Sequence, residues 1–127
     1  MSAVLAAADA LVAAFGRHDS KAYFDAFAPS ATFIFYNLDR TLADRAAYEA
    51  EWASWESRDG FRVKSCRSTD RNVQVIGETA IFTHAVETEL TIAGEDLMNR
   101  ERETIVFARE PDGRWLAIHE HLSALPT

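Results

Sequence analysis

Three of the four histidines fall in segments that could form neighbouring strands of a sheet. His119 and His121 are two residues apart, so on an extended strand both side chains point to the same face. Imidazoles at this spacing can share a metal ion, and His84 could supply a third ligand from another strand. The sequence contains no His-Glu-x-x-His metal motif, however. We therefore favour a structural role for these histidines and expect no metal and no cofactor.

Carboxyl groups are the second candidate for chemistry, because the same part of the chain places glutamates among apolar and aromatic residues. Glu87, Glu103 and Glu120 are the three of interest. Burial disfavours the charged form of a carboxyl, and a second carboxyl nearby raises one of the two pKa values further. A glutamate in such surroundings can act as a general acid or base near neutral pH. The alternative is that these side chains lie solvated near strand ends, paired with arginines such as Arg100 and Arg102.

Aromatic side chains are the third group, and their spacing assigns most of them to a hydrophobic core. The set consists of Tyr23, Phe33, Phe35, Tyr48 and Trp52. Two or three of them are candidates for a pocket wall, where a Tyr hydroxyl or a Trp N–H orients a ligand that the ring buries. Tyr23 is the strongest of these candidates.

Composition limits the class of protein. Among 127 residues, 13 Lys and Arg stand against 20 Asp and Glu, and the net charge of −7 argues against a nucleic-acid partner. A hydrophobic content of 48% is typical of a globular chain, and we expect one domain over residues 1–127. Cys66 is the single cysteine, predicted to be a small buried hydrophobe, and it fits a reducing compartment. Without a signal-peptide pattern or an apolar run of spanning length, we expect a cytoplasmic protein with no membrane partner.

The elements that must position these residues are helices first and strands afterwards, which predicts an α+β fold. Residues 3–16 carry one apolar helical stripe. A second helix is expected to begin at Asp19 or Ser20 and to stop before Pro29. Asp44 is expected to cap a third helix, which ends at Asp59-Gly60.

The second part of the chain predicts a curved sheet of four long strands and one short strand. The short strand is expected over 31–36. The long strands are expected over 61–75 (with a bulge or bend at 68–70), 79–92, 98–109 and 114–123. Because the turns between the long strands are short, we expect these strands to pair antiparallel.

This order of elements, together with the last third of the chain, resembles a known superfamily. The residues that carry the resemblance are Arg102-Glu103-Thr104-Ile105-Val106-Phe107, Gly113-Arg114-Trp115 and His119-Glu120-His121-Leu122-Ser123. The chain resembles the nuclear transport factor 2-like superfamily in its SnoaL-like branch, and most closely the association domain of calcium/calmodulin-dependent protein kinase II and its stand-alone bacterial relatives. The resemblance implies a cone-shaped, cystatin-like barrel with three N-terminal helices packed in a strongly curved antiparallel sheet. It also implies a pocket at the open end and a homodimer formed through the outer face of the sheet.

The resemblance extends to individual pocket positions. The pocket tyrosine of the kinase domain matches Tyr23, and its tryptophan matches Trp52. The basic floor of that pocket does not match, because the corresponding positions hold Glu87, Ile105 and Leu122. The resemblance therefore implies a neutral to acidic pocket, with a neutral, cationic or proton-donating ligand in place of a carboxylate.

Alternation along the strands extends this placement to their other residues. If Glu87, Ile105 and Leu122 face inward, the other inward residues are Thr83, Ala85, Glu89, Glu101, Glu103, Phe107, Leu116, Ile118 and Glu120. The outward residues are then His84, Arg102, Thr104, Trp115, His119 and His121. The predicted catalytic residues are Glu87 and Glu120, with Glu103 as a third carboxyl and Tyr23 orienting the ligand. The predicted ligand contacts are Tyr23, Phe35, Tyr48, Trp52, Ile105 and Leu122.

Two functions fit these residues, and a fold shared by many activities does not decide between them. The first is a stand-alone pocket protein that binds a small, mostly apolar ligand. In its enzymatic form, Glu87 or Glu120 moves a proton without a cofactor, in isomerase, dehydratase or cyclase chemistry like that of ketosteroid isomerases and polyketide cyclases. The alternative is a non-catalytic module that dimerises or builds a larger assembly. The enzyme hypothesis requires a carboxyl inside a water-poor pocket, and the assembly hypothesis requires oligomers beyond a dimer.

Overall fold

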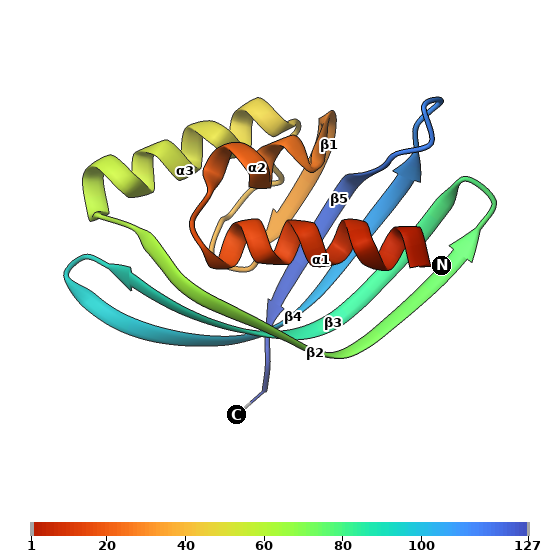
Figure 1. The fold of residues 1–127 in the computed structure, drawn as a ribbon. Coiled ribbons are helices and arrows are strands. Elements are labelled where there is room, and N and C mark those ends of the chain that lie inside the picture. Colours follow the sequence, from red (N-terminus) through yellow and green to blue (C-terminus); the bar gives the residue numbers. More distant parts are fainter. Residues whose placement is uncertain (1, 127) are drawn as a thin grey trace.

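Three helices lie on the concave side of one curved sheet in the computed structural model, which describes residues 2–126 (Figure 1). The helices are α1 (Ser2–Gly16), α2 (Ser20–Asp25) and α3 (Arg45–Asp59). The strands are β1 (Phe27–Phe35), β2 (Arg62–Ile76), β3 (Thr79–Ile92), β4 (Glu95–Arg109) and β5 (Trp115–Ala124). The predicted α+β class and the predicted order of elements are confirmed. Among the described residues, no helix is long and apolar enough to cross a membrane.

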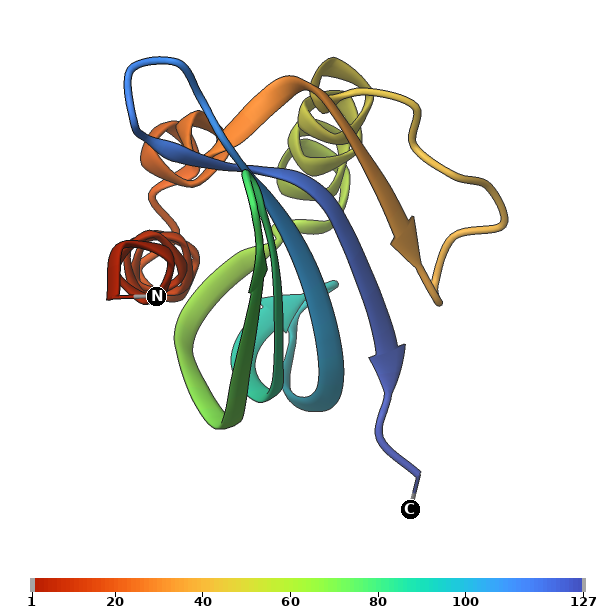
Figure 2. The same cartoon turned by 90° about the vertical axis from the view of Figure 1, so that its right-hand side faces the viewer.

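The sheet has the strand order β1-β5-β4-β3-β2. The four long strands pair antiparallel, as their short turns predict, whereas β1 pairs parallel with β5. The parallel pairing is possible because β1 and β5 are distant in the sequence and no tight turn joins them. β1 and β2 form the two edges, so the sheet bends around the helices without closing (Figure 2). The helices pack their apolar faces against the concave side of the sheet.

Two strands begin earlier than the sequence predicts. β1 begins at Phe27 instead of residue 31 and therefore contains Pro29. Proline is tolerated there because β1 is an edge strand, and its register with β5 is interrupted between Phe27 and Thr32. β4 begins at Glu95 instead of residue 98, because a turn of two residues precedes it.

That two-residue turn decides which side chains of β3 and β4 share a face. Ala93 and Gly94 both have positive φ, at 53° and 79°, as a tight hairpin turn requires. The register that follows sets His84 opposite Glu103 and Glu87 opposite Arg100. Odd positions of β4 therefore share a face with even positions of β3. The inward and outward positions predicted for β4 are correct, but those predicted for β3 are exchanged. Thr83, Ala85, Glu87 and Glu89 face outward, and His84 faces inward.

A second departure from simple alternation occurs in β5. Val106 pairs with His119 but Phe107 pairs with Ala117, so Ile118 is an extra residue in a bulge. Ala117 is consequently fully buried beside Phe107, and the predicted inward positions Leu116 and Ile118 are wrong. Trp115, predicted to face outward, packs against the core instead. Beyond the bulge the prediction is correct, since Glu120 is buried and Leu122 lies against the core.

Short-range hydrogen bonds place the helices that carry the aromatic residues. The Asp19 carboxylate accepts from the Ala22 N–H at 3.1 Å and begins α2, as predicted. The Asp44 carboxylate accepts from the Ala47 N–H at 2.8 Å and begins α3. The buried faces of these two helices hold Tyr23 and Phe24 on α2 and Tyr48 and Trp52 on α3. The caps thus fix where four aromatic rings enter the concave side of the sheet.

Gly60 ends α3 with a left-handed backbone, at φ 64°. A Cβ at this position would meet no atom within 4 Å, so the cost of a side chain is conformational and not steric. We expect Gly60→Ala to lower the free energy of unfolding by about 1–2 kcal/mol, the penalty of this conformation for an ordinary residue. Urea unfolding measures it. Gly60→Asn should lose less, because asparagine adopts the left-handed region more readily, and equal stability of Gly60→Ala and the parent would contradict the assignment.

Candidate functional site

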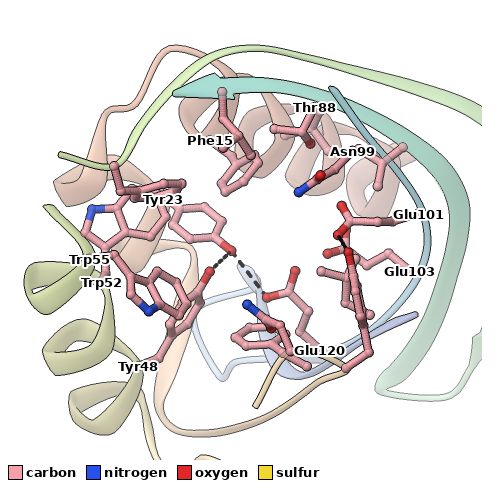
Figure 3. A pocket seen from close by; sticks show the side chains of 18 of the residues that line it. Phe15, Tyr23, Tyr48, Trp52, Trp55, Thr88, Asn99, Glu101, Glu103 and Glu120 are labelled. Atoms are coloured by element: carbon pink, nitrogen blue, oxygen red, sulfur yellow. Dashed lines mark hydrogen bonds between the residues drawn. The ribbon is translucent and has the colours of Figure 1, made fainter. Parts of the chain in front are cut away.

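A cavity of about 120 Å³ lies between the helices and the concave face of the sheet (Figure 3). Its helical side is mostly aromatic, formed by Phe15 of α1, Tyr23 of α2 and three residues of α3. Those three residues are Tyr48, Trp52 and Trp55. The opposite side is formed by β3, β4 and β5 and includes three carboxyl groups, of Glu101, Glu103 and Glu120. Aromatic and acidic walls therefore face each other across a small space.

Two tyrosines and a glutamate form a hydrogen-bonded chain at the base of the cavity. The Tyr23 hydroxyl donates to Glu120 Oε1 at 3.3 Å, and the hydroxyls of Tyr23 and Tyr48 lie 2.9 Å apart (Figure 3). Since Tyr23 has one hydroxyl proton, Tyr48 is the donor between the two tyrosines. Glu120 is buried at 3% exposure, and both tyrosine rings are buried as well. Helices α2 and α3 thus reach across the core to hold a carboxyl of β5.

The chain continues through the sheet to two further side chains. The carboxyl of Glu120 lies beside that of Glu103 on the inner face of β4, and the two share a hydrogen bond when one of them is protonated. Glu103 Oε1 lies 2.7 Å from His84 Nε2, and His84 Nδ1 lies 2.6 Å from Ser68 Oγ. The partners assign the tautomer of the imidazole: Ser68 donates to Nδ1, and Nε2–H donates to Glu103. A continuous path of hydrogen bonds therefore runs from Ser68 on β2 to Tyr48 on α3.

The glutamate pair holds a proton, because two buried carboxyls so close together cannot both be ionised. Burial raises the pKa of Glu120 well above its usual range, and the adjacent Glu103 charge and hydrogen bond raise it further. Burial also raises the pKa of Glu103, while the hydrogen bond from Glu120 lowers it. The proton therefore resides on Glu120, which donates it to the Glu103 carboxylate. The pair titrates as one unit and not as two independent groups.

His84 stays neutral beside this pair. Burial lowers the pKa of the imidazole to about 4, since the residue is 3% exposed on the inner face of β3. The contact between His84 and Glu103 is consequently a hydrogen bond from a neutral ring and not an ion pair. The imidazole orients the Glu103 carboxylate without cancelling its charge.

Two more polar groups line the cavity away from this chain. Glu101 is buried at 6% exposure and accepts a hydrogen bond from the Tyr36 hydroxyl at 2.6 Å. Burial raises the pKa of Glu101, and partial burial with the same hydrogen bond raises the pKa of Tyr36 to about 12. Trp52 is 2% exposed, and its buried Nε1–H has no hydrogen-bond partner among the described residues. A buried donor without an acceptor is costly, and a ligand oxygen in the cavity would satisfy it.

The structure gathers most of the predicted ligand contacts around one cavity. Tyr23, Phe35, Tyr48, Trp52 and Leu122 line it, as does the catalytic candidate Glu120. Ile105 does not form part of the wall, because it is fully buried in the core with Phe82 opposite it on β3. Of the two glutamates predicted to be catalytic, Glu87 is placed wrongly: it lies on the outer face, where Arg67 Nη2 approaches its Oε1 at 3.4 Å. Glu103, expected as a third carboxyl, takes the place beside Glu120 instead.

The histidines are not brought together. His84 faces the inside of the sheet, whereas His119 lies on the other side, with its Nδ1 2.8 Å from Thr32 Oγ1. His121 is exposed. Within residues 2–126, the structure shows no group of three His, Cys, Asp or Glu that could hold a metal ion. Cys66 is half-buried, and burial raises the pKa of its thiol to about 12.

Sequence reasoning missed His84 and Glu101 as site residues. The signal for His84 was the Ala93-Gly94 turn, since a two-residue turn sets it opposite Glu103. Glu101 shares the inner face of β4 with Glu103, and alternation alone placed it inside. Phe15 lies in the apolar stripe of α1, which the sequence analysis assigned to the core, and the structure places it in the wall of the cavity.

Comparison with known proteins was made for the sequence and for the structure. Residues 4–127 match the family model of the SnoaL-like domain. No curated protein matches the sequence. Among solved structures, a ketosteroid isomerase-like protein from Erwinia carotovora atroseptica is similar, with a TM-score of 0.82 at 18% identity over 99% of this chain and 96% of that one.

Two other similar structures carry different descriptions. One is an NTF2-like protein of unknown function in nutrient uptake from Rhodospirillum rubrum, with a TM-score of 0.81 at 17% identity, covering 97% of this chain and 98% of that one. The other, from Xanthomonas campestris, is a candidate calcium/calmodulin-dependent protein kinase II association domain, with a TM-score of 0.78 at 23% identity, covering 97% and 86%. At these identities the likeness shows the fold alone. The family model covers nearly the whole sequence, and the chain therefore belongs to the SnoaL-like domain family.

Proposed function

We propose that this chain binds a small, mostly apolar ligand in the cavity and transfers protons to and from it without a cofactor. The observation that carries the proposal is the buried Glu103–Glu120 pair, which is open to an aromatic cavity and bonded to Tyr23. A pair that shares one proton contains an acid and a base at the same pH. It can accept a proton on one carboxyl and return one from the other, which is what isomerisation and dehydration need.

The groups around the pair suggest where the reacting atoms would lie. A proton next to a carbonyl would pass to the carboxyl pair, and the electrons of the broken C–H bond would move onto the carbonyl oxygen. That oxygen would need hydrogen-bond donors, and Trp52, whose buried N–H has no partner among the described residues, lines the same cavity. Tyr23 holds Glu120 in place through its hydroxyl. The same carboxyls could then return the proton at another carbon.

The test uses phenylacetone, a neutral ketone with a single ring, in deuterated buffer. We expect the protein to accelerate exchange of the protons next to the carbonyl for deuterium above the rate in buffer, as measured by proton NMR. Glu120→Gln should remove most of the acceleration, because glutamine keeps the hydrogen bond with Tyr23 but cannot give up a proton as the acid of the pair.

Glu95→Gln is the matched control, since Glu95 is an exposed glutamate at the start of β4 and lies outside the cavity. It should leave the exchange rate unchanged. Absence of exchange above the buffer rate, or equal acceleration by the parent and Glu120→Gln, would contradict the proposal.

Self-association is a separate proposal and concerns the opposite face of the sheet. We propose a homodimer formed through this outer face, supported by a groove across β3, β4 and β5. The groove is lined by residues that include Thr83, Arg102, Thr104, His121 and Ser123. Light scattering at micromolar concentration should give twice the mass of the chain. A monomer would contradict the dimer, and a larger ring would favour the non-catalytic assembly module.

A further inference from the structure

We propose that the ligand of this cavity is a small organic cation, a protonated amine carried by one apolar ring. The inference rests on the proposed pocket function and names the class of ligand that the pocket selects. It follows from two features of the cavity: its uncompensated acidic wall and the aromatic wall opposite.

The acidic wall lacks a basic counterpart. Glu101, Glu103 and Glu120 all line the cavity, and within residues 2–126 no Lys, Arg or His shares its lining. Elsewhere in the chain, acidic side chains meet cations: Lys21 Nζ lies 2.9 Å from Asp25 and Lys64 Nζ lies 2.9 Å from Asp96. In the cavity, the described partners are the hydroxyls of tyrosines and the neutral His84. Buried carboxylates without a cation are costly, and a cationic ligand would remove that cost.

The charge of the wall sets the preference among ligands. With one proton on the Glu103–Glu120 pair, that pair carries one negative charge, and Glu101 adds a second when it ionises. A neutral ligand leaves these charges unpaired, and an anionic ligand adds to them. A cationic ligand lies between the carboxyl groups and favours the ionised form of every carboxyl that it approaches. Binding should therefore release protons to the solvent.

The aromatic wall suits a cation as well. The rings of Phe15, Tyr23, Tyr48, Trp52 and Trp55 face the carboxyls across the cavity (Figure 3). The faces of such rings carry negative electrostatic potential and attract ammonium groups, most strongly where water is excluded. Aromatic rings and carboxylates around one small space thus offer an amine favourable contacts from two sides.

The Trp52 indole and the size of the cavity show how binding can be followed and what can fit. The indole lines the cavity at 2% exposure, so its N–H signal reports on a bound ligand. The volume of about 120 Å³ limits the size of what fills it. An engineered protein cavity of about 150 Å³ binds benzene, so this one suits a single ring with a short arm.

The test compares three molecules of nearly the same shape and different charge: 2-phenylethylamine, 2-phenylethanol and phenylacetate. The readout is the indole N–H signal of Trp52 in nitrogen-15 NMR spectra, assigned by its loss in Trp52→Phe. We expect the amine to shift this signal with an affinity at least tenfold higher than the alcohol, and phenylacetate to bind more weakly than both. Calorimetry in two buffers of different ionisation enthalpy should show protons released on binding of the amine.

Glu101→Gln should reduce the preference for the amine over the alcohol at least fivefold, because it removes one carboxylate and keeps the shape of the side chain. Glu95→Gln, outside the cavity, should keep the full preference. The groups that titrate around the amine are Glu101, Glu103, Glu120, Tyr23, Tyr36 and Tyr48, with His84 behind Glu103.

Each outcome separates this inference from the function on which it rests. If the alcohol or phenylacetate binds as tightly as the amine while phenylacetone still exchanges its protons, the cationic preference is wrong and the proposed proton transfer stands. If the amine is preferred but Glu101→Gln keeps the whole preference, the acidic wall is not its source and the inference fails. If none of the three molecules shifts the Trp52 signal while phenylacetone still exchanges its protons, the inference fails and the proposed proton transfer stands; if that exchange is absent as well, both are contradicted.

Discussion

Replacing Glu120 by glutamine is expected to raise the free energy of unfolding at pH 8 by about 1–3 kcal/mol, the usual cost of a poorly solvated buried polar group. Glu120 is 3% exposed and sits beside the Glu103 carboxyl, so its ionised form is disfavoured in the folded state. Glutamine keeps an acceptor for Tyr23 and a donor for Glu103, with no charge to bury. A substitution at a catalytic candidate would thus stabilise the fold, as groups placed for function often cost stability.

The dependence on pH gives this prediction its sign. The pKa of Glu120 is raised in the folded protein, so its contribution to stability is complete below the pKa of the unfolded chain. The contribution is then lost as the pH rises through the folded value. The difference in stability between Glu120→Gln and the parent should therefore grow with pH, from near zero in acid to its full value in base. Urea unfolding from pH 5 to pH 9 measures it.

The matched control is Glu95→Gln, because Glu95 is exposed and should not change the pH profile. Because the parent and Glu120→Gln both keep His84, its titration largely cancels in the difference between them. A constant difference across this pH range would show that Glu120 titrates alike in the folded and unfolded chains, contrary to the structure.

Removal of His84 is expected to have the largest destabilising effect, about 3–5 kcal/mol for His84→Ala, as the sum of a core cavity and a buried carboxylate left without its donor. The imidazole is 3% exposed and lies 2.7 Å from Glu103 and 2.6 Å from Ser68. His84→Gln should recover part of this loss, since its amide can donate to Glu103. Equal losses of stability in the two variants would mean that His84 stabilises the fold through packing and not through its hydrogen bond to Glu103.

The same residue controls the acidic limit of stability. Burial lowers the pKa of His84 to about 4, so the unfolded chain takes up its proton before the folded one does. The stability that His84 contributes is present above the usual histidine range and is lost as the pH falls towards 4. His84→Gln has no such titration and should lose less stability than the parent between pH 7 and pH 5, measured by urea unfolding. A parent that loses no more than this variant would contradict a buried neutral imidazole.

Most of the fold followed from local sequence signals, because helix caps and strand patterns act over short distances. Asp19 and Asp44 begin the helices they were expected to cap, and Gly60 ends the third. The bend expected at 68–70 coincides with a register shift after Thr69 and with Asp70 at φ 51°. The start of β1 could not be predicted in this way, since Pro29 is acceptable only because tertiary structure makes that strand an edge.

The site was harder to predict because it depends on register between strands. Glu120 and Glu103 were placed correctly, since alternation within β4, and within β5 beyond its bulge, decides their direction. Glu87 was placed wrongly and His84 was missed for one reason: the inward face of β3 was assigned from the resemblance, and the pairing across the two-residue turn at Ala93-Gly94 gives the opposite face. One residue more or less in a turn exchanges the two faces of the next strand. Alanine at positive φ is uncommon, so a two-residue turn at Ala93-Gly94 is difficult to predict from the residue types alone.

The bulge in β5 is a second limit of the same kind. Ile118 is the extra residue between Ala117 and His119, and nothing in the local sequence distinguishes it from its neighbours. The bulge lets Ala117 stay beside Phe107 while Glu120 stays opposite Ile105. Both contacts depend on packing between strands in the folded core, so the pattern of residues along one strand does not predict them.

The shared proton of the Glu103–Glu120 pair is the feature on which the proposed function depends, and carbon-13 NMR of the glutamate carboxyls tests it most directly. The signal of Glu120 is identified by its loss in Glu120→Gln and followed as the pH is raised. We predict that it titrates well above the usual range of a glutamate pKa, and that Tyr23→Phe moves it higher still, because the Tyr23 hydrogen bond lowers the pKa of Glu120. A Glu120 carboxyl that titrates in the usual glutamate range, unaffected by Tyr23→Phe, would contradict the account.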